Sequence, residues 1–186
     1  MSVELKRRPF TVGEYYRMAD SGILTEGDRV ELIEGEIVQI TPIGSRHAAY
    51  VDRLNELFAV QVRSRARLRV QGPVRLDEFS EPEPDIALLK PRDDFYTRSH
   101  PGPGDVLLIV EVADASVRYD REVKIPLYAK AGIPEVWLVD LPKKTVEVYR
   151  NPAESGYEEI RISRKGDTLS PTALSELEIR VEEILV

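Results

Sequence analysis

The sequence contains no cysteine, which excludes disulfide bridges, thiolate metal centres and cysteine nucleophiles. It also lacks long apolar runs: residues 106–110 form the longest, whereas a membrane-spanning helix needs about 20 apolar residues. The first ten residues, MSVELKRRPF, are charged and have no apolar stretch like that of a signal peptide. We therefore expect a cytoplasmic protein without a membrane partner.

Net positive charge is absent as well. The net charge is −7 and the sequence pI is about 5.1, so the chain does not coat nucleic acid through bulk charge. A nucleic-acid enzyme is still allowed, because carboxylates that bind cations are themselves a source of negative charge. With 186 residues and 42% hydrophobic content, we predict one globular domain over residues 1–186, with a polar tail at residues 1–9.

The first half of the chain alternates helical and strand patterns. Thr11 and Glu14 form a capping box, which predicts a helix ending near Gly22. Two β-rich runs joined by Glu34-Gly35 predict a β-hairpin. Apolar residues spaced three and four apart predict a helix from Ser45 to about Arg63. Strands are predicted at residues 68–71, 74–76 and 85–89.

The second half begins with a polar loop rich in proline and glycine, at residues 90–105. The run VLLIVEV, residues 106–112, is typical of a central strand covered on both faces. A helix is predicted over residues 119–131, kinked by Pro126 and capped by Gly132. Strands follow at residues 135–140, 145–150 and 158–162, then a helical turn at 181–185. This order predicts an α/β (α+β) fold with a mixed sheet flanked by helices.

Glu111 interrupts the apolar run of the predicted central strand. A buried, unpaired carboxylate costs several kcal/mol, so a cation, a buried basic side chain or solvent at the strand end must compensate it. Asp85 follows Pro84 and leads directly into the apolar strand IALL. By itself it is more typical of a residue that merely starts a strand or turn. Two carboxylates on neighbouring strands would suit Mg²⁺, which prefers carboxylates, waters and substrate phosphate.

Three further residues are candidates for the same site. Asp120 and Lys124 are four apart in the predicted helix and could form an ordinary surface ion pair. Alternatively Lys124 points back to the carboxylates, where its ammonium would hold a water or stabilise phosphate charge. Asp120 is then a candidate for substrate binding. Glu31 lies in the first hairpin strand and is either a further ligand or part of a polar face.

Candidate phosphate contacts are few. His47 lies near the start of the helix at 45–63, where it could donate to a phosphate. Arginines alternate in VRSRARLRV and form a basic stripe if the segment is extended, or spread around the helix if it continues; they are Arg63, Arg65, Arg67 and Arg69. We take Arg65 and Arg67 as possible substrate contacts. Walker, GxGxxG, HExxH and GxSxG motifs are absent.

Several segments together resemble the Uma family of restriction-endonuclease-like proteins, within the PD-(D/E)XK nuclease superfamily. The resemblance covers about residues 10–150 and rests on RVELIEGEIV, His47, PEPDIALL and LLIVEVADASVRYDREVKIPLYAKAGIPEVWLVD. It implies a restriction-endonuclease-like core with an N-terminal helix and β-hairpin. One departure is Asp114-Ala115-Ser116, where family members commonly read Ser-Pro-Ser.

The resemblance also implies site roles. Asp85 and Glu111, with the Val112 carbonyl, would bind Mg²⁺ or Mn²⁺, and Glu31 would assist. The usual superfamily lysine lies two residues after the glutamate, where this chain has Ala113. The family is thought to supply it from the following helix, which Lys124 matches. The implied activity is metal-dependent hydrolysis of phosphodiester bonds in DNA.

Two other readings stay open. The chain could be a catalytically inactive nuclease-like module that binds DNA or a protein partner, which predicts no cleavage with any divalent metal. It could also be another hydrolase with paired carboxylates, such as a glycosidase, which predicts activity without metal and leaves Lys124 without a task. A homodimer is plausible, because cutting both strands of a duplex needs two sites.

Overall fold

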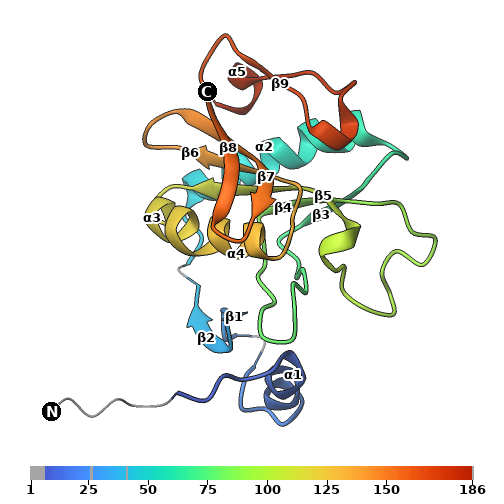
Figure 1. Cartoon of the computed structure of the whole chain (residues 1–186), viewed down its shortest axis with the longest axis vertical. Coiled ribbons are helices and arrows are strands. Elements are labelled where there is room, and N and C mark those ends of the chain that lie inside the picture. The colour runs from blue at the N-terminus through green and yellow to red at the C-terminus, as the bar shows by residue number, and fades with distance from the viewer. Residues whose placement is uncertain (1–6, 26, 41, 186) are drawn as a thin grey trace, which may run out of the picture.

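A six-stranded mixed sheet forms the centre of the molecule, in the strand order β3-β4-β5-β6-β7-β8 (Figure 1). The computed structural model describes residues 7–25, 27–40 and 42–185. β5 and β6 pair in parallel, and every other neighbouring pair in this sheet is antiparallel. The strands are β3 Arg67–Val70, β4 Ile86–Leu89, β5 Val106–Ala113, β6 Glu135–Asp140, β7 Thr145–Ala153 and β8 Gly156–Ser163. The predicted mixed sheet flanked by helices is confirmed.

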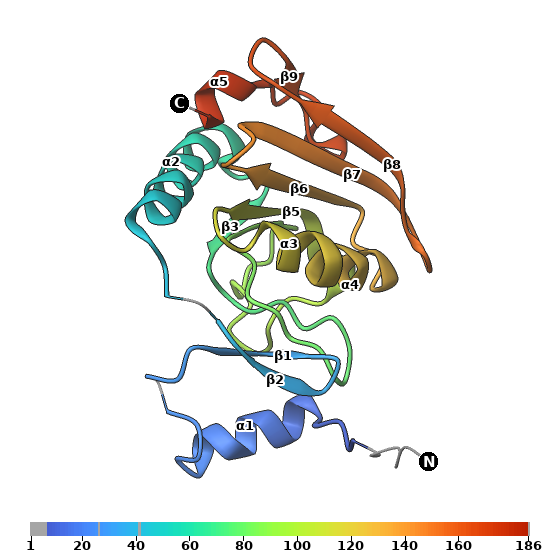
Figure 2. The same ribbon diagram turned by 90° about the vertical axis from the view of Figure 1, so that its left-hand side faces the viewer.

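Helices cover both faces of this sheet (Figure 2). On one face lies α2, Ser45–Val62, together with a C-terminal segment that contains η3 Thr172–Leu174, α5 Val181–Ile184 and the two-stranded pair of β9 Thr168–Leu169 and β10 Ile179–Arg180. On the other face lie α3 Val117–Tyr119, the π-helical turn η2 Asp120–Lys124 and α4 Ile125–Lys130. These two layers give β5 the buried position that its sequence predicts.

The core fixes β5 in place. Ile109 and Val110 are fully buried on its opposite faces, in the two separate core clusters. On the α2 side, Phe58 packs against Trp137 with ring centroids 6.2 Å apart. Burying an apolar side chain of this size stabilises a fold by about 1.5–3 kcal/mol. Glu111 therefore sits on a rigid strand.

The N-terminal helix and hairpin form a separate unit below the sheet (Figure 2). Both are confirmed as α1 Val12–Asp20, with its capping box, and as β1 Val30–Ile33 paired with β2 Glu36–Gln39. Part of the predicted polar tail, residues 1–6, lies outside the described residues. The rest is ordered on this unit, because Arg7 pairs with Glu36 and Arg8 pairs with Glu14.

Two predicted elements need correction. Residues 74–76 form no strand, although Val74 and Leu76 are buried. Their backbone bonds close a loop instead, from Val74 N–H to the Pro82 carbonyl and from Leu76 N–H to the Ser80 carbonyl. Pro73, which precedes this segment, and Pro82, which faces Val74, lack the N–H donors that a strand ladder needs.

The predicted helix at 119–131 begins earlier, at Val117, and contains the π turn η2, which ends two residues before Pro126. The Ile125 N–H bonds to the Asp120 carbonyl, five residues back, and Pro126 has no N–H to continue an α pattern. Gly132 ends the helix at φ +77°, as predicted. The polar loop at 90–105 is confirmed apart from η1, a short 3-10 helix at Pro103–Asp105. Within the described parts of the chain, no helix is long and apolar enough to span a bilayer.

Candidate metal-dependent active site

Asp85 and Glu111 come together at the ends of two neighbouring strands. β4 and β5 are antiparallel with Ile86 opposite Val110, so Asp85 continues the register opposite Glu111. The Asp85 N–H donates to Glu111 Oε2 at 3.3 Å, and the Val112 N–H donates to Asp85 Oδ2 at 2.9 Å. The two carboxyl groups therefore lie in one pocket, as the sequence predicted.

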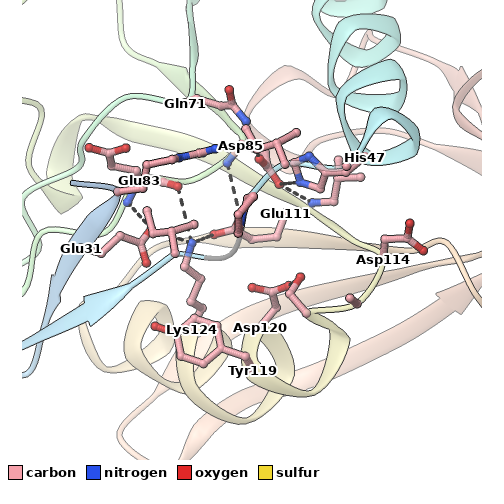
Figure 3. Close-up of a pocket in the computed structure, with 18 of the residues that line it drawn as sticks. Glu31, His47, Gln71, Glu83, Asp85, Glu111, Asp114, Tyr119, Asp120 and Lys124 are labelled. Atoms are coloured by element: carbon pink, nitrogen blue, oxygen red, sulfur yellow. Dashed lines mark hydrogen bonds and ion pairs between the residues drawn. The ribbon is translucent and has the colours of Figure 1, made fainter. Parts of the chain in front are cut away.

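This pocket has a volume of about 530 Å³ and an excess of negative charge (Figure 3). Six carboxylate side chains line it against the permanent cations of Arg29 and Lys124; they are Glu31, Glu83, Asp85, Glu111, Asp114 and Asp120. Its other wall is apolar and comes from β2 and the segment after it, with Val38, Ile40, Pro42 and Ile43. Such a pocket favours a cation and repels a bare phosphate.

Lys124 is held at the centre of the carboxylates. Its Nζ lies 2.9 Å from Glu31 Oε1 and 3.2 Å from Glu111 Oε1, and it donates to the Glu83 carbonyl at 3.5 Å (Figure 3). Its side chain is only 7% exposed. Burial disfavours the ammonium, but the charges of Glu111 and Glu31 outweigh this and raise the pKa of Lys124. Lys124 is therefore charged throughout the physiological range.

Glu111 is the carboxyl group whose ionisation the fold opposes most clearly. Burial raises its pKa to about 8, the negative charges of Asp85 and Asp120 act in the same direction, and Lys124 counteracts only part of the effect. The Tyr128 hydroxyl donates to Glu111 Oε1 at 2.5 Å. Glu111 is therefore buried in surroundings that favour its neutral form, although Lys124 and Tyr128 both contact it.

Two side chains orient Asp85. His47, in the first turn of α2, places Nε2 3.0 Å from Asp85 Oδ2, and Gln71 Nε2 donates to Asp85 Oδ1 at 3.2 Å. The hydrogen bond to Asp85 raises the pKa of His47 even though burial opposes it. His47 therefore contacts a predicted metal ligand directly.

The π turn η2 carries another acid of the pocket, Asp120. Asp120 is 5% exposed and accepts a hydrogen bond from Ser116 Oγ at 2.6 Å, while burial raises its pKa. Tyr119 also lines the pocket, and its buried hydroxyl has no hydrogen-bond partner among the described residues. Asp114 lies at the same pocket and pairs with Arg46 at 2.9 Å.

Comparison with known proteins identifies the family of this chain. A family model described as "Uma2: Putative restriction endonuclease" matches residues 12–182. The chain belongs to this family. Among solved structures, the chain is similar to "a putative nuclease belonging to DUF820" from Anabaena variabilis, with a TM-score of 0.71 and 21% identity over 95% of this chain and 97% of that one. At that identity the likeness establishes the shared fold. No curated protein matches.

For this Uma2-family protein, the donor set at Asp85 and Glu111 fits a hard divalent cation. Both supply carboxyl oxygens from rigid strands, and they line the same pocket. In the described part of the chain, no three or more histidine, aspartate or glutamate side chains are grouped to hold a metal. Mg²⁺ is compatible with this, because it often takes one or two carboxylates and completes its shell with water and phosphate oxygens.

Most of the predicted site residues line this one pocket: Glu31, His47, Asp85, Glu111, Val112, Asp120 and Lys124. Arg65 and Arg67 do not. Arg65 pairs with Glu176 at 2.5 Å, and Arg67 stacks over Phe95 at 4.2 Å. The stripe of four arginines does not form, because Arg63 leaves the helix at φ +46° and the strand begins only at Arg67.

Sequence reasoning missed Glu83, Tyr119 and Tyr128. Glu83 binds through its backbone, since its N–H donates to Glu31 Oε1 at 2.8 Å and its carbonyl accepts from Lys124. Tyr128 carried a usable signal, because it lies four residues after Lys124, a helical spacing that puts side chains on one face. Glu83 gave no such signal, since its contacts depend on how the loop before β4 meets the hairpin.

Proposed function

We propose that this protein is a metal-dependent nuclease that hydrolyses phosphodiester bonds in DNA. The observation that carries the proposal is the meeting of Asp85, Glu111 and Lys124 in one acidic pocket, from three separate parts of the chain. Membership of a family described as restriction endonucleases supports DNA as the substrate. We expect the activity in the cytoplasm.

The chain's own groups would divide the work as follows. Asp85, Glu111 and the Val112 carbonyl would hold Mg²⁺ or Mn²⁺. When bound, the ion would supply Lewis acidity at the phosphate and lower the pKa of a water molecule. Lys124, held in place by Glu31, would orient the attacking water or stabilise the negative charge that develops on phosphate oxygens. Because the acidic pocket repels a phosphate by itself, cation and substrate binding should be coupled.

Cleavage assays with isosteric variants test this proposal. Asp85→Asn and Glu111→Gln should each lower the rate of Mg²⁺- or Mn²⁺-dependent DNA cleavage by roughly 100-fold or more, because each removes a charged ligand while keeping its shape. Supercoiled plasmid and labelled single-stranded and duplex oligonucleotides serve as substrates, with EDTA as the metal-free control. Glu154→Gln, an exposed acid in the turn after β7, is the matched control and should cleave normally.

Three outcomes would contradict the proposal. Undiminished cleavage by both site variants would remove the pocket from the chemistry. Cleavage that persists in EDTA would favour a metal-independent hydrolase. DNA binding without cleavage under either metal would favour the inactive nuclease-like module. Cutting both strands of a duplex would need two such sites, which a homodimer would supply.

A further inference from the structure

The outer edge of β8 is an open sheet edge. β8 ends the strand order, and in the described residues its backbone pairs with β7 alone (Figure 2). Proteins commonly protect such an edge with proline, charged side chains (lysine especially) or a bulge, or keep it very short. β8 has eight residues, Gly-Tyr-Glu-Glu-Ile-Arg-Ile-Ser, with neither proline nor lysine. Its three charged side chains are of both signs, and its register with β7 is regular from Arg150 to Val146. Its unpaired N–H and C=O groups can accept another strand.

Exposed apolar surface lies on the same strand. Ile160 is 58% exposed and Ile162 is 50% exposed. Being two residues apart, they point to one face of the sheet. Single exposed apolar residues are ordinary, but two neighbours on an open edge mark a place where a partner would cover them.

We infer that β8 pairs antiparallel with β8 of a second copy of this chain, with the two-fold axis at Ile160. An axis perpendicular to the sheet reverses the strand direction and keeps the two faces in place, so the two sheets join into one. Residues that are directly opposite in an antiparallel pair lie on the same face of the sheet. The axis must therefore pass between the two copies of one residue, which then face each other. Near the middle of the strand, this leaves Glu159, Ile160 and Arg161 as centres.

Charge decides among these three registers. An axis at Glu159 sets two glutamates directly opposite each other, and an axis at Arg161 does the same with two arginines. An axis at Ile160 sets Glu159 opposite the partner's Arg161, and symmetry repeats this pair. Like charges directly opposed are destabilising and opposite charges stabilising in cross-strand pairs. Only the register at Ile160 is free of a like-charge pair and also brings the two Ile160 side chains together.

The existing contacts of these two charged residues are weak enough to be exchanged. Asn151 donates to Glu159 at 3.4 Å, and Arg161 lies 4.0 Å from Asp167, all on the exposed surface. No β8 residue lines the acidic pocket. The inferred interface therefore shares no residue with the proposed active site, and nicking of one DNA strand tests the site without the dimer.

Sedimentation equilibrium of the full chain tests this interface. The wild-type protein should dimerise reversibly as its concentration rises. Arg161→Glu should weaken dimerisation by roughly tenfold or more, because both cross-strand pairs become repulsive. The double variant Glu159→Arg/Arg161→Glu should restore it, since the pairs return with their signs exchanged. Arg63→Glu, the same charge reversal at an exposed residue beyond the end of α2, should leave dimerisation unchanged.

Failure takes three forms. A wild-type protein that is monomeric at all concentrations overturns the inference and leaves the edge to another kind of partner. A dimer that Arg161→Glu does not weaken lies on another surface. A double variant that stays as weak as the single one, with an unchanged circular dichroism spectrum, rules out the register centred on Ile160.

Discussion

At the scale of single residues, Lys124 is one positive charge that contacts two buried acids, Glu111 and Glu31. Lys124 is shared between Glu111 and Glu31, so neither carboxylate has a full counter-charge. Burial makes this deficit expensive and raises the pKa of Glu111 to about 8. The metal-free protein therefore keeps a site that is costly to ionise, a pattern typical of functional groups.

The pH dependence of stability should reveal this cost. Between an unfolded pKa near 4.5 and a folded pKa of about 8, Glu111 binds a proton only in the folded state, so its contribution to stability falls as pH rises through this window. Glu111→Gln mimics the neutral form at every pH. In EDTA, its melting temperature relative to wild type should rise between pH 5 and 9, by about 2–4 °C per kcal/mol relieved.

Thermal melts across this pH range provide the measurement, again with Glu154→Gln as control. The difference between the control and wild type should stay flat with pH. A Glu111→Gln variant that becomes less stable relative to wild type at alkaline pH would show that the ionised carboxylate is instead well compensated by Lys124.

At the scale of elements, the N-terminal hairpin brings Glu31 to the sheet, and its turn depends on Gly35. Gly35 has φ +79°, and a Cβ there would lie 2.3 Å from the Pro9 Cβ. The Phe10 N–H also donates to the Gly35 carbonyl at 2.9 Å. The turn is thus both left-handed and in close contact with the segment leading into α1.

Alanine substitution separates these two demands. Gly35→Ala combines about 1–2 kcal/mol of left-handed strain with roughly 1–3 kcal/mol of overpacking against Pro9. Gly22→Ala is the matched control, because Gly22 has φ +75° and nothing within 4 Å of the added Cβ. Urea unfolding should show the larger loss for Gly35→Ala. Equal losses would mean that the contact with Pro9 imposes no constraint.

At the scale of the whole molecule, the net charge of −7 and the acidic pocket act in the same direction. Both attract divalent cations and both repel DNA phosphates. Arg65 and Arg67, the predicted phosphate contacts, instead pair with Glu176 and stack over the ring of Phe95. Binding of the cation should therefore stabilise the whole fold and precede productive binding of DNA.

Ligand linkage makes this measurable without any activity. Mg²⁺ or Mn²⁺ at about 100 times its dissociation constant should add roughly 2.7 kcal/mol to the stability of the folded protein. Thermal melts should show an upward shift that saturates with metal concentration. Asp85→Asn should abolish most of the shift, whereas Glu154→Gln should keep it. A shift of equal size in both variants would place the bound cation outside the pocket.

Most helices and strands could be predicted from the sequence, because capping residues, turn residues and apolar periodicity act over a few neighbouring residues. The capping box at Thr11, the Glu34-Gly35 turn and the unbroken apolar run before Glu111 each appear as predicted. The strand expected at 74–76 does not form, because alternating apolar residues indicate which side chains are buried and not whether the backbone pairs with another strand. The arginine stripe did not form because residues 63–66 make a turn between α2 and β3 instead of extended chain.

The sequence by itself determined which positions had to be buried and which acids would be costly there, since periodicity and charge are local properties. The tertiary structure alone decided which distant groups meet. The pairing of β4 with β5 sets Asp85 beside Glu111, and the hairpin brings Glu31 to Lys124. Glu83 joined them without any sequence signal, because its partners Glu31 and Lys124 lie far away in the chain and are fixed only when the layers pack.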